Sequence, residues 1–146
     1  MEQITIRQPD NFHVHFRQGG LMAKVVPVTA RYFARALVML NTESPILNGA
    51  NVKENRDKIN AVKGEGDFQP LMTIKLTKGT TSKIIEEAFR AGAIAAKYYP
   101  VGVTNNAEAG ISDHKSAYLL FRTMADLGMV LCIHGEQPGV SEEKAG

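Results

Sequence analysis

The chain has 146 residues, of which 44% are apolar and 22% are charged, the composition of a globular domain with a real core. Its 17 basic and 15 acidic residues are spread without a basic block, which argues against nucleic-acid binding. No stretch approaches the ~18 apolar residues of a membrane span, and the amino terminus lacks a signal-peptide pattern. The single cysteine, Cys132, cannot form an internal disulfide, so we expect a reducing, cytoplasmic location.

Short apolar runs alternate with helical patterns along most of the chain, which is typical of repeated βα units and a parallel sheet. The sequence predicts strands near 12–16, 36–40, 71–76, 93–98 and 129–133. Helices are expected near 22–34 and 52–62, from the cap at Thr81 and Ser82 to Gly92, and from the cap at Ser112 and Asp113 to Gly128.

No repeat, low-complexity tract or linker divides these elements. A closed barrel of eight βα units takes ~250 residues, about twice the room that this chain offers. We therefore expect an α/β fold in which residues 1–146 form a single domain, either an open parallel sheet or about half of a barrel.

Two histidines separated by one residue are the first chemical signal. In a strand, His13 and His15 point to one face while Val14 and Phe16 point to the other, so both imidazoles can bind one metal ion. Arg17 joins the histidine face, and a guanidinium grips a carboxylate with two parallel hydrogen bonds. On its own, a pair of histidines spaced in this way is more often found at a surface or in a turn, with no ligand role.

Further polar residues stand at the carboxyl ends of later predicted strands, where α/β barrels and open α/β sheets both carry their active sites. Asn41 follows the second strand and could also only shape a turn. Lys97, near the end of the fourth, could extend its stem to water or be buried with a lowered pKa, and a neutral amine reacts with carbon dioxide. His134 ends the fifth and could also be a satisfied core residue. His114, at an exposed helix start, is given no ligand role.

Other kinds of site find little support. The sequence has no phosphate-binding glycine loop, no Gly-x-Ser-x-Gly motif and no zinc-type cysteine pair. Cys132 lies in an apolar run, so we expect it to pack as a small hydrophobe rather than act as a nucleophile.

Taken together, the motifs resemble the amino-terminal part of the dihydroorotase family, of the bacterial type within the amidohydrolase superfamily. The resemblance runs through essentially the whole chain, in order and spacing, and rests on the segments 9–17, 36–41, 70–73, 95–100 and 133–136. It implies an eight-stranded βα barrel of the TIM type with two zinc ions that activate water. Residues 1–146 would then form one partial barrel domain, with about the first four and a half βα units of that barrel. The implied reaction is the reversible interconversion of N-carbamoyl-L-aspartate and L-dihydroorotate in pyrimidine synthesis.

The resemblance also assigns roles to individual residues. It implies that the metal ligands are His13, His15, His134 and a carboxylated Lys97 that bridges the two zinc ions. It implies that the substrate is bound by Arg17, Asn41, Thr104 and His134. The chain departs from the family pattern at three positions, each next to a predicted substrate residue. Gln18 replaces aspartate, Leu40 replaces proline and Asn105 replaces threonine.

A further histidine ligand and the aspartate that shuttles the proton come from later strands in the family, so no catalytic residue is expected within this chain. We therefore expect the isolated chain to be inactive, and the full-length form to be a homodimer with a small-molecule substrate, dihydroorotate or N-carbamoyl-aspartate. Two alternatives stay open. One is a related cyclic amidohydrolase such as a dihydropyrimidinase or hydantoinase, and the other is a metal-free interaction remnant.

Overall fold

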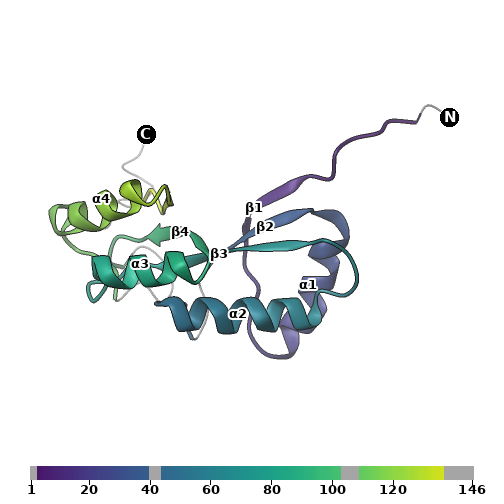
Figure 1. Ribbon diagram of the computed structural model, residues 1–146, viewed down its shortest axis with the longest axis horizontal. Coiled ribbons are helices and arrows are strands. Elements are labelled where there is room, and N and C mark those ends of the chain that lie inside the picture. The colour runs from purple at the N-terminus through teal and green to yellow at the C-terminus, as the bar shows by residue number, and fades with distance from the viewer. Residues whose placement is uncertain (1–2, 40–43, 103–108, 137–146) are drawn as a thin grey trace, which may run out of the picture.

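The computed structural model describes residues 3–39, 44–102 and 109–136, in which strands and helices alternate (Figure 1). The strands are β1 (Asp10–Val14), β2 (Arg35–Val38), β3 (Gln69–Lys75), β4 (Ala93–Tyr98) and β5 (Val130–Ile133). The helices are α1 (Gly20–Tyr32), α2 (Gly49–Val62), α3 (Ser82–Arg90) and α4 (Tyr118–Asp126), and a 3-10 turn, η1 (His114–Ala117), precedes α4. The predicted order of elements is confirmed, with the bounds of β4 as predicted and those of the other strands shifted by one or two residues.

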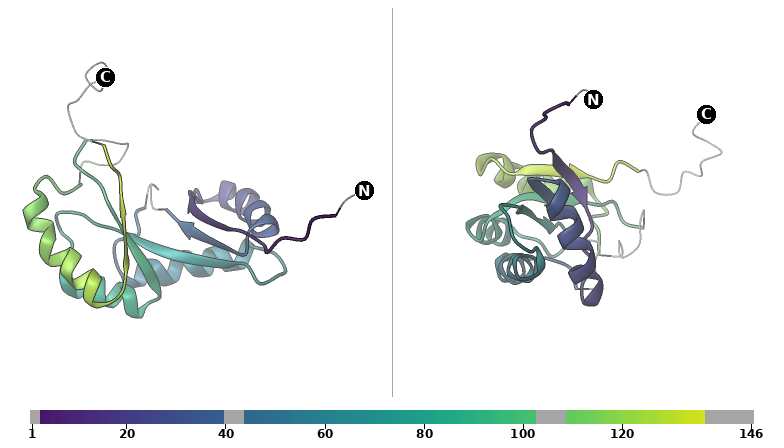
Figure 2. Two further views of the ribbon diagram at one scale, coloured as in Figure 1. Left: turned by 90° about the horizontal axis from the view of Figure 1, so that it is seen from above. Right: turned by 90° about the vertical axis from the view of Figure 1, so that its right-hand side faces the viewer.

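All five strands are parallel, and their order in the sheet is their order in the chain, β1-β2-β3-β4-β5. An open doubly wound sheet reverses its strand order at one point, whereas a barrel does not. The sheet curls strongly into a half-barrel, and consecutive helices pack against each other along it (Figure 2). The prediction of a partial TIM-type barrel is therefore confirmed.

The outer face of the sheet carries the main core. Along β3 and just beyond it, Met72, Ile74 and Leu76 have no exposed surface and pack with buried helix residues such as Ile59 and Ile85. Each large apolar side chain buried in this way contributes about 1.5–3 kcal/mol. The outer core therefore fixes the strands that position the inner face.

The inner face has a smaller apolar floor, formed by Leu37, Met39 and Ala95 with Leu71 and Cys132 packed against them. Cys132 is half-buried and packs as a hydrophobe, and burial raises the pKa of its thiol. The same face carries three polar side chains that are almost wholly buried, namely Thr73, Lys75 and Lys97.

Two shifts of register interrupt the sheet. Asn11 pairs with Ala36 and Val14 pairs with Val38, so β1 uses one residue more than β2 over this stretch. A similar shift follows the pairing of Met72 with Ala93, because the next residue of β3 pairs with Ala95.

Side-chain caps fix the starts of α2 and α3. Asn48 caps α2 by accepting from the amide of Asn51 at 3.0 Å, and Thr81 caps α3 by accepting from the amide of Ile84 at 3.3 Å. Asp113, one of the predicted caps, caps η1 rather than α4. None of the helices among the described residues has the length and apolar character needed to cross a bilayer.

Candidate metal centre

His13 and His15 lie side by side at the carboxyl end of β1. Their Nε2 atoms are 3.1 Å apart and their rings meet edge to face. Although the strand ends at Val14, the alternation continues beyond it, since Val14 and Phe16 pack with the outer core. The predicted separation of the histidines from their apolar neighbours is therefore confirmed.

The surroundings of both histidines favour the neutral imidazole. Burial lowers the pKa of His13, and the positive charges of Lys97 and His134 lower it further. Burial also lowers the pKa of His15, assisted by the charges of His13, Arg17 and Lys97. Neutral imidazole is the form that binds metals, so both rings are ready to act as ligands near neutral pH.

The geometry of the pair fits a shared cation. Two nitrogens each ~2.1 Å from a tetrahedral zinc ion lie about 3.4 Å apart, close to the observed Nε2 separation. The other ring nitrogen of His15, Nδ1, is buried without a hydrogen-bond partner in the described structure. The backbone here is also held, because the amide of His13 donates to Oδ1 of Asn11 at 2.9 Å.

Lys97 reaches the same region from β4. Its side chain is only 6% exposed, its Nζ donates to the backbone oxygen of Ile133 at 3.2 Å, and it lies 5.5 Å from the centre of the Tyr99 ring. Burial lowers the pKa of Lys97, with a smaller opposing effect from Cys132. Of the two predicted alternatives, the structure therefore selects a buried amine over one extended into water.

His134 follows β5 and its ring stacks on Tyr99, with the ring centres 6.0 Å apart. Its amide donates to the backbone oxygen of Tyr98 at 3.0 Å, which holds the residue at the end of the sheet. The Nε2 atom lies 2.9 Å from a carboxylate oxygen of Glu136. A cation bound at Nε2 would therefore have to displace Glu136.

Gln18, which departs from the family pattern, links two loops at this end of the half-barrel. Its Nε2 donates to the backbone oxygen of Ser44 at 3.0 Å, and its Oε1 accepts from the Ser44 amide at 3.3 Å. Arg17, the preceding residue, also makes polar interactions. The predicted substrate residues Asn41 and Thr104 lie outside the described residues.

The described structure brings the predicted metal residues near one another without assembling a complete site. Within residues 3–39, 44–102 and 109–136, no three histidine, cysteine, aspartate or glutamate side chains gather in metal-binding positions. Sequence reasoning also missed three buried residues at the same end, Thr73, Lys75 and Tyr99. The signal for two of them was present, because Thr73 and Lys75 alternate with Met72 and Ile74 as inward and outward residues of one strand.

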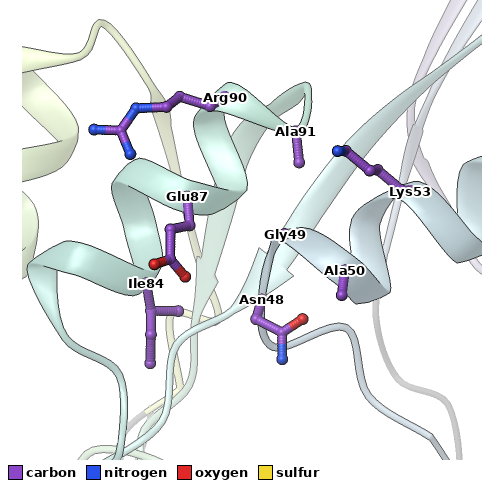
Figure 3. Close-up of a pocket in the computed structure, with 8 residues that line it drawn as sticks. All are labelled: Asn48, Gly49, Ala50, Lys53, Ile84, Glu87, Arg90 and Ala91. Atoms are coloured by element: carbon purple, nitrogen blue, oxygen red, sulfur yellow. The ribbon is translucent and has the colours of Figure 1, made fainter.

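A separate pocket of ≈ 600 Å³ lies between the first turn of α2 and one side of α3 (Figure 3). Glu87 and Arg90 line it from α3, and Lys53 lines it from α2. Gly49 lets the two helices approach closely, since a Cβ there would lie 2.8 Å from the backbone oxygen of Glu87. None of the predicted site residues lines this pocket.

The curled parallel sheet, with a His-x-His pair at the end of its first strand and a buried lysine in its fourth, defines the first part of a TIM barrel of the amidohydrolase type. Comparison with known proteins narrows this class. The chain is 46% identical to a dihydroorotase from Marinobacter nauticus over 134 residues, which cover 92% of this chain and 39% of that protein. The chain thus matches the amino-terminal two-fifths of dihydroorotases.

Solved structures agree. Dihydroorotase from Campylobacter jejuni superimposes with a TM-score of 0.82 and 30% identity over 91% of this chain and 39% of its own. Dihydroorotase from Saccharomyces cerevisiae in complex with 5-fluoroorotic acid superimposes with a TM-score of 0.81 and 31% identity. The match covers 92% of this chain and 37% of the yeast chain. An L-hydantoinase from Arthrobacter aurescens shares the fold, with a TM-score of 0.71 and 17% identity. This match covers 89% of the present chain and 29% of the hydantoinase. No family model matches the chain.

Proposed function

We propose that this chain carries the first part of a dihydroorotase active site. The reaction is the reversible hydrolysis of the cyclic amide of L-dihydroorotate to N-carbamoyl-L-aspartate, a step of pyrimidine synthesis. The observation that carries the proposal is the approach of His13, His15 and Lys97 at one end of the half-barrel, where their charges act on one another. The relatives that match over nine-tenths of this chain are dihydroorotases, which supports the same reaction.

The proposal includes two zinc ions and a carbamate on Lys97. The donor set suits them, because neutral imidazoles bind zinc and a buried amine with a lowered pKa reacts with carbon dioxide. In this proposal the two ions would be held by the imidazoles of His13 and His15, by the carbamate on Lys97 and, once it has left Glu136, by the imidazole of His134. When bound, the two ions would supply an activated water and a polarised amide carbonyl.

Substrate binding follows from charge. Arg17 lies directly after the histidine pair, and its guanidinium can hold the carboxylate of dihydroorotate with two hydrogen bonds. The yeast neighbour was solved with 5-fluoroorotic acid, a pyrimidine carboxylic acid, which supports a carboxylate-binding site. We assign Asn41, Thr104 and His134 to the same substrate. Dihydrouracil and hydantoins lack this carboxylate, so a site built around Arg17 favours dihydroorotate over them.

We further propose that residues 1–146 form a single partial barrel domain that is inactive alone, because the resemblance assigns the proton-shuttling aspartate and another histidine ligand to later strands. The chain spans about two-fifths of the length of the relatives that it matches. A homodimeric full-length form and a cytoplasmic location belong to the same proposal.

A chimera tests the function directly. In it, this chain replaces the matching amino-terminal part of the Marinobacter nauticus relative, and ring opening of dihydroorotate and of dihydrouracil is measured with zinc present. We expect hydrolysis of dihydroorotate in preference to dihydrouracil. Lys97→Met and His134→Asn should each lower kcat/KM by about 100-fold or more, since each removes a metal ligand. His114→Asn, outside the site, is the matched control.

Each alternative has its own outcome. If the chimera hydrolyses dihydrouracil in preference to dihydroorotate, the result would favour the hypothesis of a hydantoinase-like enzyme. A chimera that folds, binds no zinc and hydrolyses neither compound would favour an interaction remnant and contradict the proposal.

A further inference from the structure

Two buried lysines stand opposite each other on neighbouring strands of the inner face. Lys75 of β3 and Lys97 of β4 are register partners, so their side chains emerge on the same side of the sheet. Each is only 6% exposed. Lysine is rarely buried to this degree, so two of them in register on one face of the sheet are unusual and point to a function.

Both amines also meet the same aromatic ring. The Nζ of Lys75 lies 5.3 Å from the centre of the Tyr99 ring and the Nζ of Lys97 lies 5.5 Å from it. Tyr99 is itself 5% exposed and stacks on His134. Lys75 therefore belongs to the same cluster as the predicted metal residues, although neither the family resemblance nor the strand-end pattern assigned it a role.

A third polar group lies on this face. Thr73 precedes Lys75 by two residues on β3 and pairs with Ala95, which precedes Lys97 by two residues on β4. The Thr73 side chain has no exposed surface, and its hydroxyl has no hydrogen-bond partner in the described structure. A buried hydroxyl without a partner is unfavourable, and it becomes satisfied if an acceptor with more oxygens enters the cluster.

We propose that Lys75 is a positioning residue whose ammonium group favours the carboxylated form of Lys97. An ammonium group beside a carbamate forms an ion pair, whereas beside the neutral amine of Lys97 it has no such attraction. The carbamate also brings two oxygens, which can accept from Lys75 and from the Thr73 hydroxyl. This inference rests on the proposed function, because it concerns the carbamate that the proposed function places on Lys97.

The carboxylation step balances without a redox partner. The neutral amine nitrogen of Lys97 attacks the carbon of dissolved carbon dioxide, and a C–N bond forms. One C=O bond pair moves onto oxygen, and a proton leaves the nitrogen for solvent. The product is one carbamate anion beside the Lys75 cation, so a neutral amine beside a cation becomes a pair of opposite charges.

Carbamate occupancy, rather than turnover, tests this inference. The 146-residue chain is equilibrated with zinc and ¹³C-labelled bicarbonate, and the carbamate carbon is quantified by ¹³C NMR. Lys75→Met, which keeps the length and apolar stem, should lower occupancy by about tenfold because the carbamate loses its counter-charge. Lys75→Arg keeps the charge and should retain most of the signal. Lys58→Met, at a lysine whose side chain is 53% exposed, is the matched control and should change nothing.

Two further variants keep the outcomes distinct. Lys75→Gln supplies a second neutral side chain, and thermal unfolding of each variant without zinc and bicarbonate shows whether the fold persists. A folded Lys75→Met or Lys75→Gln chain with the occupancy of the unaltered protein overturns the role of Lys75 and leaves the proposed function intact. If Lys97→Met gives the same carbamate signal as the unaltered protein, the carbamate is not on Lys97. That result overturns this inference together with that part of the proposed function.

Discussion

The two faces of the curled sheet are built from alternate residues of the same strands, yet they differ in chemistry. On the outer face of β3, Met72 and Ile74 are wholly buried against the helices. On the inner face of the same strand, Thr73 and Lys75 are just as inaccessible but polar. One face supplies the free energy that holds the strands, and the other can then carry buried polar groups that are unfavourable by themselves.

The largest expected effect is on the outer face. Ile74→Ala should lower the free energy of unfolding by about 3 kcal/mol, because it removes buried methyl and methylene groups and leaves a cavity. Urea denaturation of the chain measures the loss. Ile4→Ala, at a residue that is 85% exposed, is the control and should have little effect. An equally small effect of Ile74→Ala would contradict the assignment of stability to the outer face.

The next effect is on the inner face and concerns metal rather than folding. His13→Asn should weaken zinc binding by about 100-fold, which is ~2.7 kcal/mol, because an imidazole ligand is lost. Isothermal titration calorimetry with zinc measures the change, and His114→Asn is the matched histidine control. Unchanged affinity in His13→Asn would show that zinc binds elsewhere.

A smaller effect, an increase in stability rather than a loss, is expected when Thr73 of β3 is replaced. Thr73→Val should raise the free energy of unfolding of the metal-free chain by about 1 kcal/mol, because it removes a buried hydroxyl without a hydrogen-bond partner and nearly keeps the shape. Urea denaturation is again the measurement. A loss of stability would mean that the hydroxyl is hydrogen-bonded and that the two faces differ less than their contacts indicate.

The smallest effect is the response of the inner face to pH. The pKa values of His13 and His15 are below 6.5 in the folded chain, chiefly because of burial. The unfolded chain therefore binds more protons, and the stability of the metal-free protein should decrease as the pH falls below about 6.5. Thermal unfolding between neutral and mildly acidic pH should show a weaker decrease in the double variant His13→Asn, His15→Asn. The same pH dependence in the double variant would assign the effect to other groups.

Much of the fold could be predicted because apolar periodicity records the outer face. The strand at β4 was predicted at its observed bounds, and Gly92 and Gly128, with φ values of 96° and 69°, follow the helices where the sequence placed their ends. The predicted start of the last helix was only partly right. Asp113 caps a 3-10 turn, and the α-helix begins at Tyr118.

The inner face was harder to predict, because a buried polar residue leaves no apolar signal. Lys97 was recognised through its place near a strand end, whereas Lys75, its partner in the sheet, was missed since register is not visible in one strand alone. The contact of His134 with Glu136 was also beyond reach, because rotamers at a strand end depend on the surrounding structure. The metal and substrate roles stay predictions.

The two register shifts make the predicted site sensitive to the number of residues in β1 and β4. Side chains of paired residues share a face, so β1 enters the sheet with Asn11 beside the outward Ala36 and leaves it with Val14 beside the outward Val38. One additional residue between them turns His13 and His15 inward, and an additional residue in β4 does the same for Lys97. Deleting a single residue at either place would leave every predicted metal ligand in the sequence and rotate part of the set into the outer core. A homologue with one residue fewer here is therefore expected to lack the predicted metal site even when its motifs are intact.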